Sequence, residues 1–288
     1  MIKVKDRVLK GMVYISLGVT IFLFALIFIY LIIKSIPAIN NIGLGGLINL
    51  KEKWYPIGAT PTFNLLPAIC GTLYTSFLAT IFAFIFGLSA ALMLNFYLPE
   101  KFANIIFSFL DMLAGVPSVV FGFIGLSTLV PFLLKHFNLS TGQCILAASI
   151  VLGVMLLPFI ISTCSESIKL VRDRYEGMSK NAGISKEYFI IHIVFTSIKR
   201  SILAGLVMAL GRAIGETMAV MMVIGNSAIF PKLLGRGQTI PGITALEMGS
   251  IGINEIHLSA LYVANLILLI ILLILILVSQ LLKGNDRI

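Results

Sequence analysis

The stretch Gly211–Val220 reads GRAIGETMAV and lies in a segment that is largely apolar from about Ile198 to Ile224. It places Arg212 and Glu216 four residues apart, a spacing that brings two side chains together on one helix face. A charged side chain near the centre of a bilayer costs roughly 2.5–3.5 kcal/mol, so such residues usually face a bundle interior, a partner subunit or a solute path. An ion pair that merely stabilises a helix, by roughly 0.2–0.5 kcal/mol, remains the plainer interpretation.

The composition of the chain supports a membrane location for this segment. Of 288 residues, 59% are hydrophobic and only 11% are charged, whereas soluble domains are roughly half apolar and a quarter charged. Six stretches are long enough to cross about 30 Å of hydrocarbon as helices. They are Val13–Ile33, Thr72–Phe96, Ile105–Leu134 with an interruption, Cys144–Cys164, Ile198–Ile224 and Leu258–Leu282. We therefore predict an all-α, polytopic membrane protein with six transmembrane helices.

Lysine and arginine are concentrated before the first apolar stretch and in the loop after the fourth. By the positive-inside rule both regions are cytoplasmic, and six crossings place the C-terminus there too. This predicts a cytoplasmic segment 1–12, a transmembrane domain 13–282 with a cytoplasmic loop at about 165–198, and a cytoplasmic tail 283–288. The net charge of +9 then reflects topology and attraction to anionic membrane lipid, so we expect no nucleic-acid partner.

The metal-ligating residue types are scattered. Cys70, Cys144 and Cys164 are widely spaced, and none of the three histidines has a carboxylate or cysteine at ligand spacing. Metal sites need several such ligands close together. We expect no metal site and three unpaired cysteines.

A second motif lies in the third apolar stretch, where residues 113–122 read LAGVPSVVFG. Pro117 removes a backbone hydrogen bond and disfavours helix at the preceding residue. A break at membrane depth is tolerated only where protein or a watery cavity covers it. Asp111, about two turns before Ser118, adds a charge near this depth. A proline kink that serves packing alone is the alternative.

The loop from Ser165 to Lys199 is long for this protein, polar and basic. It contains Asn181–Ser185, NAGIS, between two helix-compatible stretches, and Gly183 suits a left-handed turn. The pattern predicts a helix, a tight turn and a second helix on the cytoplasmic face. An amphipathic helix that lies on lipid is the alternative.

The motifs at 115–122 and 211–220 together resemble those of phosphate-specific ABC transporter permeases. Residues Thr217–Val220, the pair Gly225-Asn226 and the stretch Ile240–Glu247, IPGITALE, favour the PstC type over its PstA paralogue. The resemblance runs from about Trp54 to Ser250. It implies the type I ABC importer permease fold, in the cytoplasmic membrane of a prokaryote.

The resemblance also implies a function and a set of partners. The function is translocation of inorganic phosphate, with a homologous PstA-type permease, a dimeric cytoplasmic ATPase and an extracytoplasmic phosphate-binding protein. The expected substrate path contains Arg212 as a fixed cation and Glu216 as its countercharge, together with Asp111, Ser118 and Thr217.

The cytoplasmic loop is similar to the permease coupling motif, in which Glu-Ala-Ala precedes a glycine and an Ile-x-Leu-Pro ending. Gly183 and Ile193 fall at the expected spacing. The Glu-Ala-Ala positions read Gly177-Met178-Ser179 instead, and Phe195-Thr196 replaces Leu-Pro. The resemblance implies that the loop docks into the ATPase. The expected coupling residues are Glu176, Gly177, Ala182, Gly183 and Ile184.

The sequence contains no Gly-x-x-x-x-Gly-Lys-[Ser/Thr] phosphate-binding loop, so the chain itself is not expected to hydrolyse ATP. ATP and Mg²⁺ would be bound by the partner ATPase, and this chain would carry no cofactor. Three alternatives remain. They are a permease for another oxyanion such as molybdate or sulfate, an ion-coupled secondary anion carrier, whose folds usually contain internal repeats, and a scaffold or sensor subunit.

Overall fold

The computed structural model describes residues 2–49, 54–56, 61–137, 139–249 and 255–283, without the side chains of residues 2–8 and 283. Within these residues the regular secondary structure is helical, and a single isolated bridge joins Tyr55 and Thr62. Six helices are long and apolar enough to cross a membrane. The predicted all-α, six-helix architecture is therefore confirmed, whereas all but the first residue of the predicted tail 283–288 lies outside the described residues.

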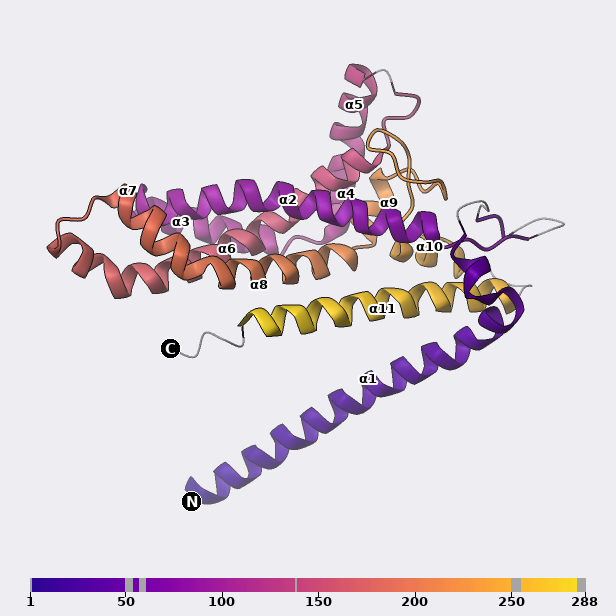
Figure 1. The fold of residues 1–288 in the computed structure, drawn as a ribbon, viewed down its shortest axis with the longest axis horizontal. Coiled ribbons are helices and arrows are strands. Elements are labelled where there is room, and N and C mark those ends of the chain that lie inside the picture. Colours follow the sequence, from indigo (N-terminus) through magenta and orange to yellow (C-terminus); the bar gives the residue numbers. More distant parts are fainter. Residues whose placement is uncertain (1, 50–53, 57–60, 138, 250–254, 284–288) are drawn as a thin grey trace.

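Most elements run along one long axis (Figure 1), and α4, η1 and α5 form an arm that leaves it. The six candidate spans are Leu9–Leu47, Leu66–Phe96, Ser118–Phe137, Ile145–Asn181, Lys186–Ile214 and Glu255–Leu282. The elements are α1 (Ile2–Leu47), α2 (Leu66–Phe96), α3 (Glu100–Ala114), α4 (Ser118–Ile124), η1 (Gly125–Leu129), α5 (Val130–Phe137), α6 (Ile145–Asn181), α7 (Lys186–Tyr188), η2 (Phe189–Val194), α8 (Phe195–Ile214), α9 (Met218–Val223), α10 (Ile240–Glu247) and α11 (Glu255–Lys283).

The core forms where α2 and α6 pack along most of their length, with α8 against both. Small residues let the backbones approach closely, as is common between membrane helices. A Cβ added at Gly153 of α6 would lie 3.1 Å from the Ala79 carbonyl oxygen, and one at Gly87 of α2 would lie 2.8 Å from Ile160 Cγ2. The two helices therefore need glycine at these crossing points.

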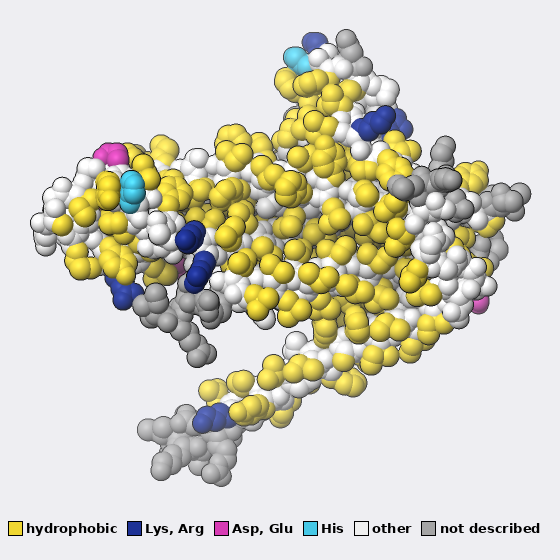
Figure 2. Space-filling model, viewed as in Figure 1, with side chains coloured by type: hydrophobic (Ala, Val, Ile, Leu, Met, Phe, Trp, Pro, Cys, Tyr) yellow, Lys and Arg dark blue, Asp and Glu magenta, His cyan; other side chains and the backbone are white. Residues whose placement is uncertain are grey.

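The N-terminal helix α1 packs against α11 but diverges from it toward the N-terminus (Figure 1). Its apolar side chains from Leu9 to Ile33 are mostly exposed. Figure 2 shows hydrophobic side chains over most of the visible face of the bundle as well. A surface of this kind is stable only against lipid tails or an apolar partner, which agrees with a membrane location.

Two of the predicted apolar stretches are not single helices. The third stretch divides at Pro117, which has φ −57° and ψ 138° and directly precedes α4. Before this break α3 runs beside α6, and after it α4 turns away (Figure 1). The fifth was expected to be helical to Ile224, but α8 ends at Ile214 and a short α9 follows. The break at Pro117 was predicted from the proline, whereas the second break was not, although Gly215, Glu216 and Thr217 interrupt the apolar run there.

The two ends of the molecule differ in character. One end, which we call the Gly183 end, carries the turn between α6 and α7. At the other, the Trp54 end, Trp54 Nε1 donates to both Glu247 carboxylate oxygens at 3.0 Å, and His257 Nε2 lies 2.7 Å from Glu247 Oε2. This contact ties the segment after α1 to α10 and α11.

Candidate functional site

The two motifs singled out in the sequence meet in the structure, because α4 packs directly on α9. A Cβ added at Gly122 would lie 2.9 Å from Ala219 Cα and 2.9 Å from Met222 Sδ. Gly125, the first residue of η1, lies between α6 and α9, because a Cβ added there would be 2.4 Å from Val151 Cγ2 and 3.1 Å from Val223 Cγ1. The glycine at position 122 therefore allows the α4 backbone to approach α9 closely, so a glycine of one motif positions the other motif.

The helix break between α8 and α9 corrects the predicted relation between Arg212 and Glu216. Arg212 lies in the last turn of α8, whereas Glu216 lies in the break, where its Oε1 accepts the Ala219 N–H at 3.2 Å. This contact resembles a helix N-cap, since it satisfies a first-turn donor of α9. The two charges therefore do not share one continuous helix, and in the described part of the chain they form no ion pair within 4.0 Å.

Arg212 is exposed in the single chain, and its guanidinium carbon lies 6.0 Å from the centre of the Phe159 ring. That contact is a cation–π interaction, which leaves the five N–H donors free to bind an anion. The position in the last helical turn also favours a cation. Among the described residues no carboxylate neutralises Arg212. The arrangement is a fixed, accessible cation beside a break in a membrane helix.

The other predicted path residues lie on several elements. Asp111 is exposed in the last turn of α3, Ser118 is the half-buried first residue of α4, and the half-buried Thr217 precedes α9. Thr217 lines a cavity of about 370 Å³ together with residues of α10 and α11. Thr217 therefore lies before α9 and beside α10 and α11. Asp111, in contrast, forms no ion pair with Arg212 in the described residues.

Two polar residues of this cavity were missed in the sequence. Asn265 Nδ2 donates to Thr244 Oγ1 at 3.1 Å and to the Leu261 carbonyl at 2.8 Å, and both Asn265 and Thr244 line the cavity. Asn265 interrupts the apolar run of α11. A single amide in a membrane helix is a usable signal, because polar side chains there usually face the protein interior.

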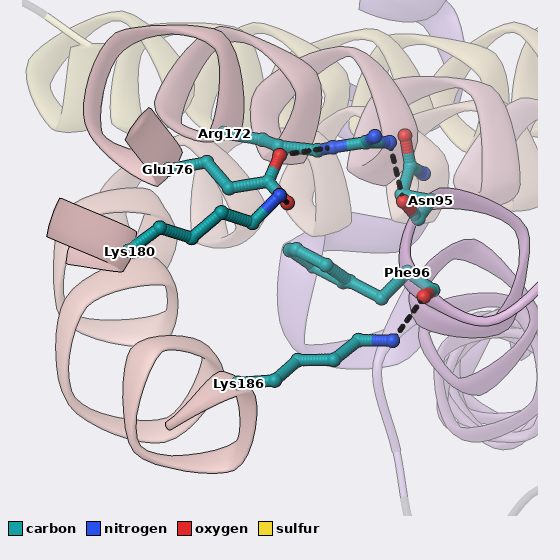
Figure 3. Close-up of polar contacts among 6 residues, drawn as sticks. All are labelled: Asn95, Phe96, Arg172, Glu176, Lys180 and Lys186. Atoms are coloured by element: carbon teal, nitrogen blue, oxygen red, sulfur yellow. Dashed lines mark hydrogen bonds and ion pairs between the residues drawn. The ribbon is translucent and has the colours of Figure 1, made fainter. Parts of the chain in front are cut away.

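A second charged cluster lies at the Gly183 end, where α2 ends against the predicted coupling loop (Figure 3). Arg172 Nη1 donates to the Asn95 carbonyl, and Lys186 Nζ donates to the Phe96 carbonyl. The last carbonyls of a helix lack partners within it and carry partial negative charge. Two cations from the loop therefore supply hydrogen-bond donors to the last carbonyls of α2, and these contacts hold the loop against the end of that helix.

Glu176 belongs to the interior of this cluster. Its Oε2 accepts from Arg172 Nε at 2.8 Å, and its Oε1 lies 2.9 Å from Lys180 Nζ. The apolar part of α6 ends near Cys164, well before this carboxylate. The hydrogen bonds from Lys180 and then from Arg172 lower the pKa of Glu176 below the ordinary value. These residues line a cavity of about 200 Å³.

The turn itself has the predicted geometry. Gly183 has φ 71°, the Gly183 N–H donates to the Lys180 carbonyl at 3.1 Å, and the Ile184 N–H donates to the Ser179 carbonyl at 3.0 Å. These contacts form a Schellman motif. Gly177, Ala182 and Gly183 are exposed, and Ile184 is half-buried. The helix–turn–helix prediction is confirmed. The Glu176 side chain lies in the charged cluster below the turn, and Gly183 lies at the tip of the turn.

The arrangement of helices is that of a membrane transport permease. It matches a chain of the MetNI methionine ABC transporter with a TM-score of 0.60 at 16% identity, over 77% of this chain and 96% of that one. A chain of an amino acid ABC transporter matches with a TM-score of 0.52 at 14% identity, over 74% of this chain and 91% of that one. At these identities the likeness shows the fold alone, which confirms the predicted importer permease fold.

The sequence comparisons define the family. Residues 83–284 match the family described as "Binding-protein-dependent transport system inner membrane component". The "Probable phosphate transport system permease protein PstC" of Methanocaldococcus jannaschii is 30% identical over 88% of this chain and 86% of its own length. "Phosphate transport system permease protein PstC" of Xylella fastidiosa is 30% identical over 81% and 76%, and "Probable ABC transporter permease protein YqgH" of Bacillus subtilis is 29% identical over 82% and 77%. The chain belongs to this family and is a multi-pass inner-membrane protein.

Proposed function

We propose that this chain is a membrane-spanning subunit of an ATP-driven importer that translocates inorganic phosphate. The observation that carries the proposal is the exposed guanidinium of Arg212 beside the break between α8 and α9, which no carboxylate of the described residues neutralises. It stands in a chain about 30% identical to relatives named as phosphate transport permeases. A permease of this kind moves its substrate without making or breaking its bonds.

Arg212 suits this task because of its shape and charge. Phosphate at neutral pH carries between one and two negative charges. A planar guanidinium binds two phosphate oxygens at once and does not deprotonate. We assign Glu216 a positioning role, since its contact with the Ala219 N–H fixes the start of α9 beside Arg212. Thr217, Ser118 and Asp111 complete the proposed path.

The break beside Arg212 matters as much as its charge. A continuous helix would pair its backbone internally, whereas the α-helical ladder ends at the Gly215 N–H, and the Glu216 N–H donates instead to the Ala213 carbonyl at 3.2 Å. Irregular backbone at membrane depth is stable only where it lines a cavity or is covered by protein. The cavity formed by Thr217, Thr244 and Asn265 lies at this break, which supports a substrate path there.

We infer the energy source and the membrane topology from the same proposal, that the chain is a permease subunit of an ATP-driven importer. ATP and Mg²⁺ are bound by a separate dimeric ATPase, which contacts the exposed tip of the α6–α7 turn around Gly183. This assigns the Gly183 end, both termini and the loop 165–198 to the cytoplasm, and the Trp54 end to the outside. A PstA-type permease completes the path, and an extracytoplasmic binding protein delivers phosphate to the Trp54 end.

Phosphate uptake into proteoliposomes that contain the full complex tests the proposal. Arg212→Gln keeps most of the side-chain bulk and removes the charge. Two charge-assisted hydrogen bonds contribute about 3 kcal/mol or more in total, so uptake should fall about a hundredfold or more. Lys10→Gln, an exposed position near the start of α1, is the control for loss of a cation. Normal uptake by an assembled Arg212→Gln complex would rule out Arg212 as the phosphate-binding cation.

A further inference from the structure

The cavity of about 370 Å³ beside the break between α8 and α9 has two walls of different chemistry. Gly215 and Thr217 form the wall at the break, and residues of α10 and α11, among them Thr244 and Asn265, form the other. The described residues that line it include no acidic or basic side chain. What this cavity recognises is therefore decided by its hydrogen-bond donors and acceptors.

Asn265 supplies an acceptor to the cavity. Its Nδ2 donates to the Thr244 hydroxyl oxygen at 3.1 Å and to the Leu261 carbonyl at 2.8 Å. A carbonyl only accepts hydrogen bonds, so the amide nitrogen, and not the amide oxygen, must face Leu261. Both N–H donors of the amide are then used, and Oδ1 is the group that remains for a ligand.

Thr244 holds the amide in this orientation. Its hydroxyl donates to the Ile240 carbonyl at 2.9 Å. A hydroxyl has a single proton, so Thr244 can only accept from Asn265 and has no proton left for a ligand. The hydrogen bonds run in one direction, from Asn265 through Thr244 to Ile240. The polar side chains of the α10–α11 wall therefore offer acceptors and no donors.

The Asn265 oxygen is accessible from the cavity. Within the described residues Oδ1 accepts no hydrogen bond, and it is not one of the buried side-chain oxygens that lack a partner. Asn265 is half-buried and lines the cavity. An oxygen that is neither paired nor buried at this position is available to a ligand in the cavity.

The wall at the break has the opposite chemistry. In the part of the chain that the structure describes, Thr217 donates no hydrogen bond from its N–H or from its hydroxyl. Arg212 lies three residues before Gly215, a spacing that brings two residues onto one helix face, so the cation lies beside this wall. Donors and a cation suit the charged oxygens of an anion, whereas the Asn265 acceptor requires a proton on the anion.

We propose that Asn265 selects a protonated oxyanion, because its Oδ1 accepts a hydrogen bond from the P–OH group of phosphate, and that it thereby excludes sulfate and molybdate. Phosphate at neutral pH retains one or two protons. Sulfate and molybdate retain none and would place an oxygen lone pair against Asn265 Oδ1. A site built to hydrogen-bond a hydroxyl discriminates against an analogue without one, because the acceptor is left unpaired. This inference rests on the proposed function, since the anion held by Arg212 must enter this cavity.

Equilibrium dialysis of labelled phosphate and labelled sulfate against the membrane complex of permeases and ATPase tests the proposal. The extracytoplasmic binding protein is left out, so that its own selectivity does not contribute. At about pH 8 both ligands are dianions and only phosphate carries a proton. A hydrogen bond to a charged group is worth about tenfold or more in affinity. The wild type should therefore bind phosphate at least about tenfold more tightly than sulfate.

Asn265→Leu keeps most of the side-chain size and removes the acceptor. It should weaken phosphate binding about tenfold and leave sulfate binding unchanged or stronger, so that the preference for phosphate is lost. The matched control is Asn104→Leu, the same change at an exposed position of α3 outside the cavity. This control should keep the preference of the wild type.

Three results would overturn the proposal. The first is equal affinity of the wild type for phosphate and sulfate, which decides the matter even if Asn265→Leu does not assemble. The second is a preference that Asn265→Leu retains as fully as Asn104→Leu. The third is phosphate binding that falls when sodium is replaced by choline and that Asn265→Leu loses only in sodium, because the acceptors would then bind a cation.

The proposed function would fail in a different way, through phosphate binding that Arg212→Gln leaves unchanged. Phosphate binding that depends on Arg212 but shows no preference over sulfate would overturn only the role of Asn265. The two failures are therefore distinguished by one set of dialysis measurements.

Discussion

Arg172 and Arg212 lie on neighbouring helices and are used in different ways. Arg172 donates to the Glu176 carboxylate at 2.8 Å and to the Asn95 carbonyl, and so joins the loop to the end of α2. Arg212 makes a cation–π contact with the ring of Phe159, and its side chain forms no hydrogen bond or ion pair with the described residues. Both are arginines in an apolar chain, yet in the part of the chain that the structure describes Arg172 is matched by a carboxylate and Arg212 is not. The comparison indicates that Arg172 stabilises the fold and that Arg212 is available to a ligand.

The strongest test of this contrast replaces each arginine by lysine. Arg212→Lys keeps the charge but loses the fork that binds two oxygens, so phosphate uptake should fall about tenfold, the value of one charge-assisted hydrogen bond. Arg172→Lys should leave uptake per assembled complex near the wild-type value. Initial uptake rates in proteoliposomes, normalised to the assembled complex, measure both. Unchanged uptake by Arg212→Lys would show that bidentate binding is not needed.

The second test concerns stability. Arg172→Met removes donors to Glu176 and to the Asn95 carbonyl, which should destabilise the complex by about 2 kcal/mol. Thermal unfolding of the purified complex measures the change. Lys101→Met, which removes an exposed cation from α3, is the matched control and should have little effect. If Arg172→Met were as stable as this control, the cluster would contribute nothing to the fold.

The third test separates the turn from the cluster at its base. Gly183→Val places a β-branched residue at φ 71°, which should cost about 1–2 kcal/mol, whereas Gly183→Asn should be tolerated because asparagine adopts this conformation. A Cβ at Gly183 meets no atom within 4 Å, so packing does not confuse the result. The valine variant should lose co-purification with the ATPase and transport-linked ATP hydrolysis. Normal coupling in that variant would remove the turn from the proposed ATPase contact.

The sequence was informative where the chemistry is local. Long apolar runs predicted the six candidate membrane helices, and Gly183 predicted a left-handed turn, because length and backbone freedom are properties of short segments. The motif resemblance also predicted the importer permease fold. These features need no knowledge of distant partners.

The sequence was less informative where distant residues decide the structure. Arg212 and Glu216 were expected on one helix, but the Glu216 contact with Ala219 and the packing of α4 on α9 establish a break. Arg172 was interpreted only as a topological charge, because its acceptor at Asn95 lies 77 residues away. Asn265 could have been noticed as an amide in an apolar run, although its partner Thr244 becomes evident only in the fold.

The smallest expected effect comes from the Glu176 carboxylate itself. Glu176→Gln removes the charge opposite Arg172 and Lys180, in pairs that are partly exposed, so the loss of stability at neutral pH should be only about 0.5 kcal/mol. The pKa of Glu176 is lowered from the ordinary value of 4.5 by hydrogen bonds from Lys180 and Arg172. Its contribution to stability is therefore present above pH 4.5 and is lost as the pH falls through the lowered folded-state pKa. Denaturant titrations of wild type and Glu176→Gln should differ at neutral pH and converge in acid. If the two proteins still differed in stability below the folded-state pKa, the charge of Glu176 would not be the cause of the difference. The contrast between the matched Arg172 and the unmatched Arg212 would then lose its basis.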